Sequence, residues 1–263
     1  MDAPFTTVGR DDDLSTGNPD YGVAFSPDGL RAYVAMGALP NITMGVRVRN
    51  KTSEPFGPFN ALGGFPDGGN HWPTTSPDGT ELFFALNTVP DVKIWRAVIT
   101  DSGGENVAAV GSLDGVAAED HPYLANERVI YFAHNPSGGY VIQRAGRSDP
   151  FTPFGPPEEV KGLGAYYYAV KPVLTSDELT IYFGAANQSD GLNGTRIRRA
   201  SRASVLEPFG TSVEVTELRA ANVLAGGDRP VWLSPDRCTF YFVTNRATGV
   251  PSDYDIWVAR RSP

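Results

Sequence analysis

The sequence contains little cysteine, little positive charge and no long apolar run, and each shortage excludes a class of protein. Cys238 is the one cysteine among 263 residues, so no disulfide can form within the chain. Lys and Arg number 22 against 30 Asp and Glu, a net charge of −8, which lacks the basic surface needed to bind nucleic acid. No segment approaches the roughly 18 consecutive apolar residues of a membrane-spanning helix. What is abundant is turn-forming residues, with 29 Gly and 22 Pro, which indicates many tight turns.

A motif of 11 residues recurs along the chain. Its five copies read FSPDGLRAYVA, TSPDGTELFFA, YLANERVIYFA, LTSDELTIYFG and LSPDRCTFYFV. The aromatic residues that mark the copies lie 48 to 59 residues apart, and they are Tyr33, Phe83, Tyr131, Tyr182 and Tyr241. A repeat of this length, with strands joined by Pro- and Gly-containing turns, is typical of propeller blades. The sequence therefore predicts an all-β fold, a five-bladed β-propeller of four-stranded antiparallel blades.

The outer strands of each blade follow from the same alignment. A third strand with alternating apolar and polar residues is expected at 46–49, 92–97, 140–145, 195–200 and 254–259. The fourth strand is expected to begin at a Pro-Phe pair in three blades, at 55–56, 150–151 and 208–209, and to lie near 107–110 in the second blade. Proline is tolerated there because an outermost strand has a free edge.

The two ends of the chain supply the two parts of one blade. The last copy ends after its third strand, and the N-terminus opens with Ala3-Pro4-Phe5, which resembles the start of a fourth strand. We therefore expect the N-terminal strand to complete the C-terminal blade and leave only short edges. The expected blades cover about residues 20–62, 70–113, 120–163, 169–218 and 228–263 with 3–14, in a single domain over residues 1–263.

The repeat resembles that of a known family. The last blade shows the pattern most fully, as LSPD at 233–236, TFYF at 239–242 and DIWVAR at 255–260. This pattern is similar to the TolB-like, WD-repeat-like β-propeller repeat of bacterial periplasmic and secreted proteins, and the resemblance extends over essentially the whole chain. It implies a secreted or periplasmic propeller, in a family whose members serve as docking platforms, recognition domains or polysaccharide-degrading enzymes. The blade count of five resembles instead that of the five-bladed glycosidases and some lectins.

The residues that enter the innermost strands are polar and differ between blades. The alignment places there the triplets Asp20-Tyr21-Gly22, Asn70-His71-Trp72, Glu119-Asp120-His121, Ala169-Val170-Lys171 and Asp228-Arg229-Pro230. Innermost strands line the channel of a propeller, so these triplets should ring one mouth, where the rings of Tyr21, Trp72 and residues 166–168 can stack on a ligand. We predict a non-catalytic recognition module for a small polar molecule, a carbohydrate in particular. Its predicted ligand-binding residues are Tyr21, Asn70, His71, Trp72, Glu119, His121, Lys171 and Arg229.

Four other interpretations stay open. The ring can be structural, with its aspartates bonded to nearby backbone. Asp20, Asp120 and Asp228 are candidates for the acid and base of a glycoside hydrolase or lyase, which needs two carboxylates about 5 to 9 Å apart. His71 and His121 are candidate ligands of a divalent cation, although no short-range metal motif is present and no cofactor is predicted. A protein partner would dock on the loops at 187–193 and 220–227. The chain is expected to be a monomer.

Overall fold

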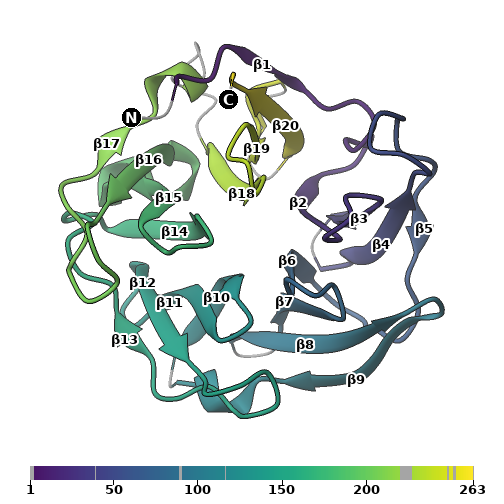
Figure 1. The fold of residues 1–263 in the computed structure, drawn as a ribbon, viewed down its shortest axis with the longest axis horizontal. Helices are drawn as coiled ribbons and strands as arrows, with labels where there is room; N and C mark the ends of the chain where they lie inside the picture. Colours follow the sequence, from purple (N-terminus) through teal and green to yellow (C-terminus); the bar gives the residue numbers. More distant parts are fainter. Residues whose placement is uncertain are drawn as a thin grey trace.

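The fold is a ring of five antiparallel sheets, each of four strands. The computed structural model describes residues 3–38, 40–88, 91–115, 117–219, 227–247, 249–250 and 253–262. Within each sheet the strands follow chain order from the axis of the ring outward, except that β1 is the outer strand of the last sheet (Figure 1). The predicted five-bladed β-propeller is confirmed.

The strands of the blades have the following bounds. Blade one holds β2 (Asp20–Phe25), β3 (Arg31–Met36), β4 (Thr43–Val48) and β5 (Asn60–Ala61). Blade two holds β6 (Asn70–Thr75), β7 (Glu81–Asn87), β8 (Val92–Thr100) and β9 (Gly103–Ala109). Blade three holds β10 (Ala118–Asn126), β11 (Val129–Asn135), β12 (Val141–Gly146) and β13 (Glu158–Glu159). Blade four holds β14 (Tyr168–Leu174), β15 (Thr180–Ala186), β16 (Arg196–Ser201) and β17 (Val213–Glu214). Blade five holds β18 (Arg229–Leu233), β19 (Thr239–Thr244), β20 (Asp255–Arg260) and β1 (Thr7–Arg10).

Helix is confined to four short 3₁₀ segments in the described residues. They are η1 (Gly111–Leu113), η2 (Gln188–Asp190), η3 (Leu192–Gly194) and η4 (Thr216–Leu218). None of the helices in the described part of the chain is long and apolar enough to cross a membrane.

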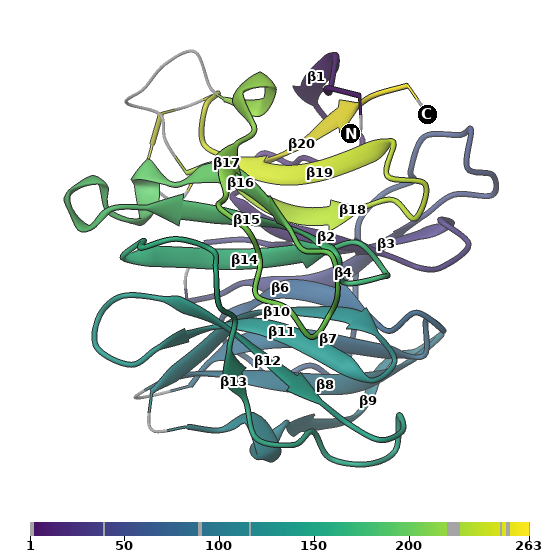
Figure 2. The same ribbon diagram turned by 60° about the vertical axis from the view of Figure 1, so that its left-hand side comes forward.

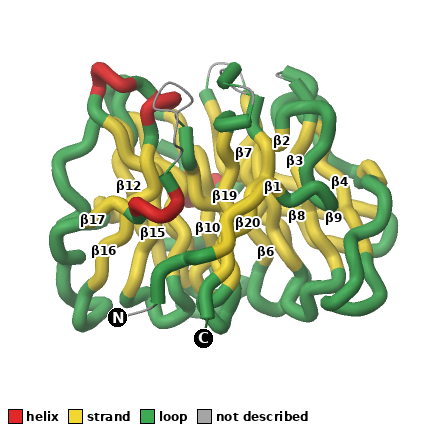
Figure 3. The backbone as a smooth tube through the Cα atoms, turned by 90° about the horizontal axis from the view of Figure 1, so that it is seen from above, coloured by secondary structure: helices red, strands yellow, loops and turns green. Residues whose placement is uncertain are grey.

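The N-terminal strand closes the ring, as predicted. β1 pairs antiparallel with β20, with Thr7 opposite Arg260 and Arg10 opposite Trp257. The two ends of the chain consequently lie at the same edge of the molecule (Figures 2 and 3). This pairing gives β20 the outer partner that its own blade lacks, so the last blade is as complete as the others.

A repeated contact between an arginine and a phenylalanine holds the outer part of four blades, and we call it the Arg–Phe clasp. Each arginine follows the third strand, donates its Nε–H to a backbone carbonyl of the first hairpin turn at 2.8–2.9 Å, and lies 4.3–4.6 Å from the ring centre. The pairs are Arg49 with Phe56, Arg147 with Phe154, Arg202 with Phe209 and Arg261 with Phe5. Phe5 thus supplies from the N-terminus the ring that the other three blades find downstream of their third strand.

The predicted starts of the fourth strands are wrong in three blades. β5, β13 and β17 begin four or more residues after the Pro-Phe pairs, whereas in the second blade β9 does include most of the segment predicted near 107–110. In blade three the clasp uses Phe154 of the second Pro-Phe pair, which is 5% exposed, while Phe151 of the first pair is 95% exposed. In four blades a Pro-Phe pair therefore marks the clasp that precedes the fourth strand, and in blade three it is the second pair, not the predicted one.

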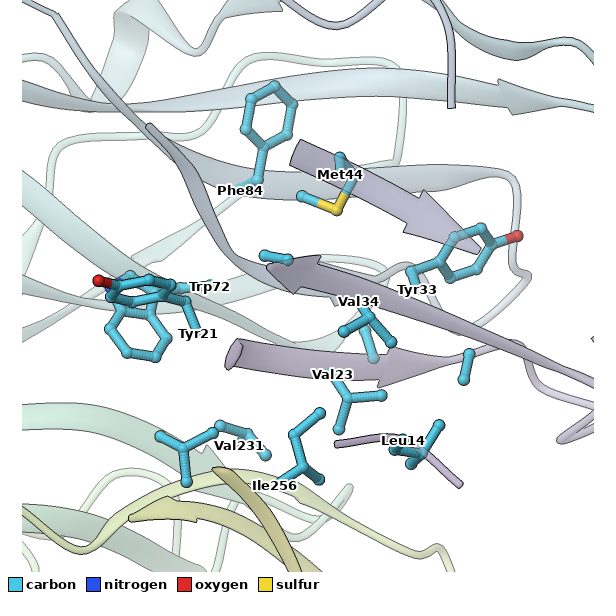
Figure 4. Close-up of a cluster of buried hydrophobic side chains, with 14 of the residues drawn as sticks. Leu14, Tyr21, Val23, Tyr33, Val34, Met44, Trp72, Phe84, Val231 and Ile256 are labelled. Carbon is cyan, nitrogen blue, oxygen red and sulfur yellow. The ribbon is translucent and has the colours of Figure 1, made fainter. Parts of the chain in front are cut away.

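The core lies between neighbouring blades. The five aromatic residues of the repeat, at positions 33, 83, 131, 182 and 241, are all buried on the second strands. One cluster joins blades five, one and two through residues such as Val23, Val34, Phe84 and Ile256 (Figure 4). Because each blade buries its faces against its neighbours, the ring is rigid enough to hold side chains at the axis in fixed positions.

Candidate functional site

Each innermost strand carries an irregularity of pairing near its first residues. The register shifts lie between residues 20 and 22, 71 and 74, 120 and 123, 170 and 173, and 230 and 232 of the five strands. At three of them a bulky residue has a left-handed backbone, with φ of 56° at Trp72, 55° at His121 and 56° at Lys171. Such a bulge breaks the alternation of a strand and re-aims side chains. A left-handed φ at these residue types costs on the order of 1–3 kcal/mol, a strain that concentrates at functional sites.

Side chains beside these bulges line a cavity of about 340 Å³ at the mouth of the ring where the innermost strands begin. Its lining residues come from the inner strands and from the loops above them, and they are Tyr21, Ile42, His71, Trp72, Asn87, Asp120, His121, Tyr140, Leu192, Arg229 and Tyr254. His71 and Trp72 are adjacent in sequence, and both line the cavity. The adjacent residues Asp120 and His121 also both line it. The size falls in the range of small-molecule sites, and a few polar groups among aromatic rings is their usual composition.

Asp120 lies between two imidazoles. Its Oδ1 is 3.3 Å from His71 Nε2, and its Oδ2 is 3.6 Å from His121 Nδ1. Burial would raise the pKa of Asp120, but His121 and His71 together outweigh it and hold that pKa well below its usual 3.8. Burial lowers the pKa of His121 well below 6.5, and Lys171 and Arg229 lower it further. At the centre of the cavity Asp120 therefore lies beside the His121 imidazole, whose Nδ1 has no hydrogen-bond partner in the described chain.

Lys171 lies against the indole of Trp72. Its Nζ is 3.4 Å from the ring centre, and a Cβ added to Gly22 would be 3.5 Å from the same atom. Burial lowers the pKa of Lys171 well below 10.5, although Asp120 acts in the opposite direction. The contact with the indole favours the charged amine by about 2 kcal/mol when it is desolvated, which offsets part of the burial penalty.

Arg229 and Tyr254 form another side of the cavity. The guanidinium lies 4.8 Å from the centre of the Tyr254 ring, and Nη2 donates to the backbone carbonyl of Leu192 at 3.1 Å. Tyr254 in turn packs edge-on against Tyr21, with ring centres 6.1 Å apart. Tyr21 continues to Trp72 at 5.5 Å (Figure 4). Aromatic rings thus form a continuous band beside the charged groups.

Three of the predicted ligand-binding residues do not line the cavity: Lys171, which lies against Trp72, and two others. Asn70 donates its side-chain amide to the backbone carbonyl of Pro66 at 2.6 Å. Glu119 accepts from Lys93 Nζ at 2.7 Å and from the backbone N–H of Gly115 at 2.9 Å. Both occupy the first position of their triplets, and that position faces away from the axis.

Of the three candidate catalytic aspartates, Asp120 lines the cavity and the other two do not. Asp20 accepts two hydrogen bonds from Thr16, and Asp228 accepts from Thr244 and Arg246 at 2.7 Å each. Like Asn70 and Glu119, these two aspartates hold the first position of their triplets. Among the residues that the structure describes, Asp120 is the one carboxylate that lines the cavity.

Two tyrosines of the cavity were not predicted. Tyr140 and Tyr254 immediately precede the third strands of blades three and five, and both line the cavity. The signal was present, because the two residues hold the same place in the repeat, before the apolar segments VIQ and DIW. Of the predicted stacking residues at 166–168, Tyr168 contacts the ring of Tyr140 at 6.5 Å, while the Tyr166 hydroxyl bonds with Ser212.

The opposite mouth holds a larger cavity of about 560 Å³, lined mainly by the turns of the first hairpins. Its polar groups already have partners. The serine of each Ser-Pro-Asp turn donates to the aspartate two residues on, as Ser76 does to Asp78 at 2.6 Å. The same bonds from Ser26 and Ser234 lower the pKa values of Asp28 and Asp236. These carboxylates stabilise turns, so the smaller cavity, with unpartnered polar groups, is the better candidate for a ligand site.

The metal interpretation finds no further support in the geometry. Within the described ranges, no group of three or more His, Cys, Asp and Glu side chains is arranged to hold a metal ion.

Replacing Lys171 by methionine is expected to raise the melting temperature at pH 7 by several degrees. A lysine whose pKa is lowered on folding destabilises the folded state below that pKa, and the penalty disappears as pH rises toward 10.5. A buried charge replaced by an apolar side chain of similar length commonly stabilises by about 1–4 kcal/mol. Thermal melts at pH 7 and pH 10 measure the effect. The exposed Lys51→Met is the control, and a Lys171→Met protein no more stable than Lys51→Met would contradict the prediction.

Solved structures show the same architecture at low sequence identity. A thermostable family-43 glycoside hydrolase superposes with a TM-score of 0.68 at 12% identity, over 96% of this chain and 92% of that chain. The GH43_1 enzyme from Xanthomonas citri, solved in complex with xylotriose, gives 0.65 at 14% identity, over 98% and 91%. TolB from Acinetobacter baumannii gives 0.56 at 13% identity, over 95% of this chain but 56% of TolB. No protein-family model and no curated protein sequence matches this chain. At these identities the similarity establishes the fold alone.

Proposed function

We propose that this propeller is a recognition module that binds a small polar ligand, a carbohydrate, in the 340 Å³ cavity without converting it. The observation that carries the proposal is the band of rings from Tyr21, Trp72 and Tyr254 beside the polar groups of Asp120 and Arg229. Aromatic faces stack on the apolar faces of sugar rings, and fixed donors and acceptors bind their hydroxyls. The strained backbone at three bulges supports a role for the cavity beyond packing.

The family-43 neighbours favour a second candidate, a glycoside hydrolase acting at the same mouth. Hydrolysis of a glycosidic bond requires a pair of carboxyl groups, one acid and one base or nucleophile. Asp120 would have to work without a second carboxylate among the described cavity residues. This shortage is why binding without turnover is the function proposed first.

The third candidate is a docking platform for a protein partner. One of its expected loops contains η2 and η3, and Leu192 of η3 lines the cavity. The other expected loop, at 220–227, lies outside the described residues except for Gly227. We infer a secreted or periplasmic location from the resemblance to the TolB-like repeat, a proposal that protease protection in whole cells would test.

Sugar binding is expected to depend on Tyr140 and not on Tyr167. Both tyrosines are half-buried, but Tyr140 lines the cavity, with its ring 6.0 Å from that of His121, whereas Tyr167 packs on Tyr168. A ligand at about a hundred times its dissociation constant adds roughly 2.7 kcal/mol of stability, a shift of several degrees. Thermal-shift titrations with mono- and oligosaccharides, including xylotriose, should show such shifts for the wild type and Tyr167→Ala and about tenfold weaker binding for Tyr140→Ala.

Two results would contradict the proposal. If no sugar raises the melting temperature at millimolar concentration, the cavity is not a carbohydrate site. If chromatography of the same mixtures shows sugar cleavage that Asp120→Asn abolishes, the protein is a glycosidase.

A further inference from the structure

The arginine in the cavity lacks a carboxylate partner. Arg229 is 6% exposed, and no Asp or Glu oxygen of the described chain lies within 4.0 Å of its guanidinium. Its Nη2 bonds to a backbone carbonyl, its Nε is buried without a hydrogen bond, and its face lies on the Tyr254 ring. Arg229 is therefore a buried cation held by one neutral acceptor and one aromatic ring.

Three other arginines with largely buried side chains each lie close to a carboxylate. Arg246 lies 2.7 Å from Asp228, Arg202 lies 3.7 Å from Glu178, and Arg147 lies 3.7 Å from Glu81. An unpaired buried charge is strongly destabilising, because its hydration is lost without an opposite charge in return. Since the fold pairs these three arginines, the unpaired one at the cavity indicates that its partner comes from outside the chain.

The remaining charges of the cavity favour a negative partner. Asp120, the carboxylate at the centre, is already engaged by the imidazoles of His71 and His121. Lys171 lies against the Trp72 ring outside the cavity lining, so Arg229 is the one Lys or Arg among the described residues that line the cavity. The molecule as a whole carries a net charge of −8, so the surface at large repels anions. The unpaired guanidinium of Arg229 is therefore a local positive charge in an acidic protein, and it favours the binding of an anion at this cavity.

We propose that the ligand is an acidic sugar, whose carboxylate binds Arg229 while its ring lies along the band of Tyr21, Trp72 and Tyr254. This inference rests on the proposed function and narrows its ligand class. The planar guanidinium matches a carboxylate in geometry, and hydrogen bonds between two charged groups are about twice as strong as neutral ones. Arg229 is then the residue that distinguishes a sugar acid from the corresponding neutral sugar.

The test compares matched sugars at constant ionic strength. Calorimetric titration with glucuronate against glucose, and with galacturonate against galactose, is expected to show binding of the acids on the order of tenfold tighter or more. Arg229→Gln should remove that preference, and Arg229→Lys should restore part of it because the charge remains. Arg237→Gln is the matched control, since Arg237 lines the opposite mouth and pairs with Asp177. Acetate alone is titrated as a probe of the carboxylate subsite.

The outcomes separate this inference from the function on which it rests. Equal binding of acidic and neutral sugars overturns the inference and leaves the carbohydrate module standing. Binding of acetate that depends on Arg229, with no binding of any sugar, supports the anion subsite and overturns the carbohydrate assignment. Binding of none of these probes overturns both.

Discussion

Phe5→Ala is expected to lower the free energy of unfolding by about 3–5 kcal/mol, the usual range for removing a buried phenylalanine. Phe5 is 4% exposed, packs on Phe240 with ring centres 5.5 Å apart, and is held by the guanidinium of Arg261 at 4.6 Å. β1 itself is largely exposed, so this buried ring helps to anchor the strand that closes the propeller. A loss of this size lowers the melting temperature by on the order of 10 °C.

The matched control is Phe151→Ala. Phe151 also follows a proline near a fourth strand, but its side chain is 95% exposed, and exposed substitutions change stability by less than about 0.5 kcal/mol. Denaturant titrations of the two variants measure the contrast. Equal midpoints for Phe5→Ala and Phe151→Ala would mean that the closure does not depend on the Arg–Phe clasp.

The architecture was predictable because equivalent residues must be buried in each of the five blades of a propeller. The motif position on the second strand, for example, is aromatic and buried in every copy, at 33, 83, 131, 182 and 241. The starts of the fourth strands were not predictable in this way. Blade three offers both Pro150-Phe151 and Pro153-Phe154, and only the reach of Arg147 to the second ring decides between them.

The location of the candidate site could be predicted from the sequence, but which side chains line it could not. The triplets of blades one, two, three and five do contribute side chains to the cavity, but only from their second and third positions, and the triplet of blade four contributes none. Simple alternation along a strand would have sent His71 and Trp72 to opposite faces, whereas the bulge with a left-handed Trp72 brings both to the cavity. Sequence patterns contain no mark for such a bulge, so Asn70 and Glu119 were included although they face away.

Asp20→Asn is expected to remove a loss of stability that the wild type undergoes between about pH 4 and pH 7. Burial raises the pKa of Asp20 from 3.8 to about 7, although hydrogen bonds from Thr16 oppose the change. Between these values the folded protein holds a proton that the unfolded chain has released, so stability falls as pH rises and levels off above pH 7. The change corresponds to about 4 kcal/mol, which Asn, neutral at every pH, does not experience.

Denaturant unfolding of both proteins from pH 4 to pH 8 measures this difference. The variant should gain on the wild type steadily with pH, and parallel curves would contradict the prediction. Asp28→Asn is the control, because its pH dependence has the opposite sign. The Ser26 hydrogen bond lowers the pKa of Asp28, so the stability that the Asp28 carboxylate contributes is lost only as pH falls below about 4.

The result also bears on catalysis. A carboxyl group with a pKa near 7 is what a general acid requires, and by that property alone Asp20 would be the strongest catalytic candidate in the chain. Asp20 is fully buried, however, and the cavity is lined by its neighbour Tyr21 instead. We therefore expect Asp20→Asn to bind sugars as the wild type does while being more stable at pH 7. The raised pKa of Asp20 then reflects its burial, and we expect the ligand to contact side chains at the second and third triplet positions instead.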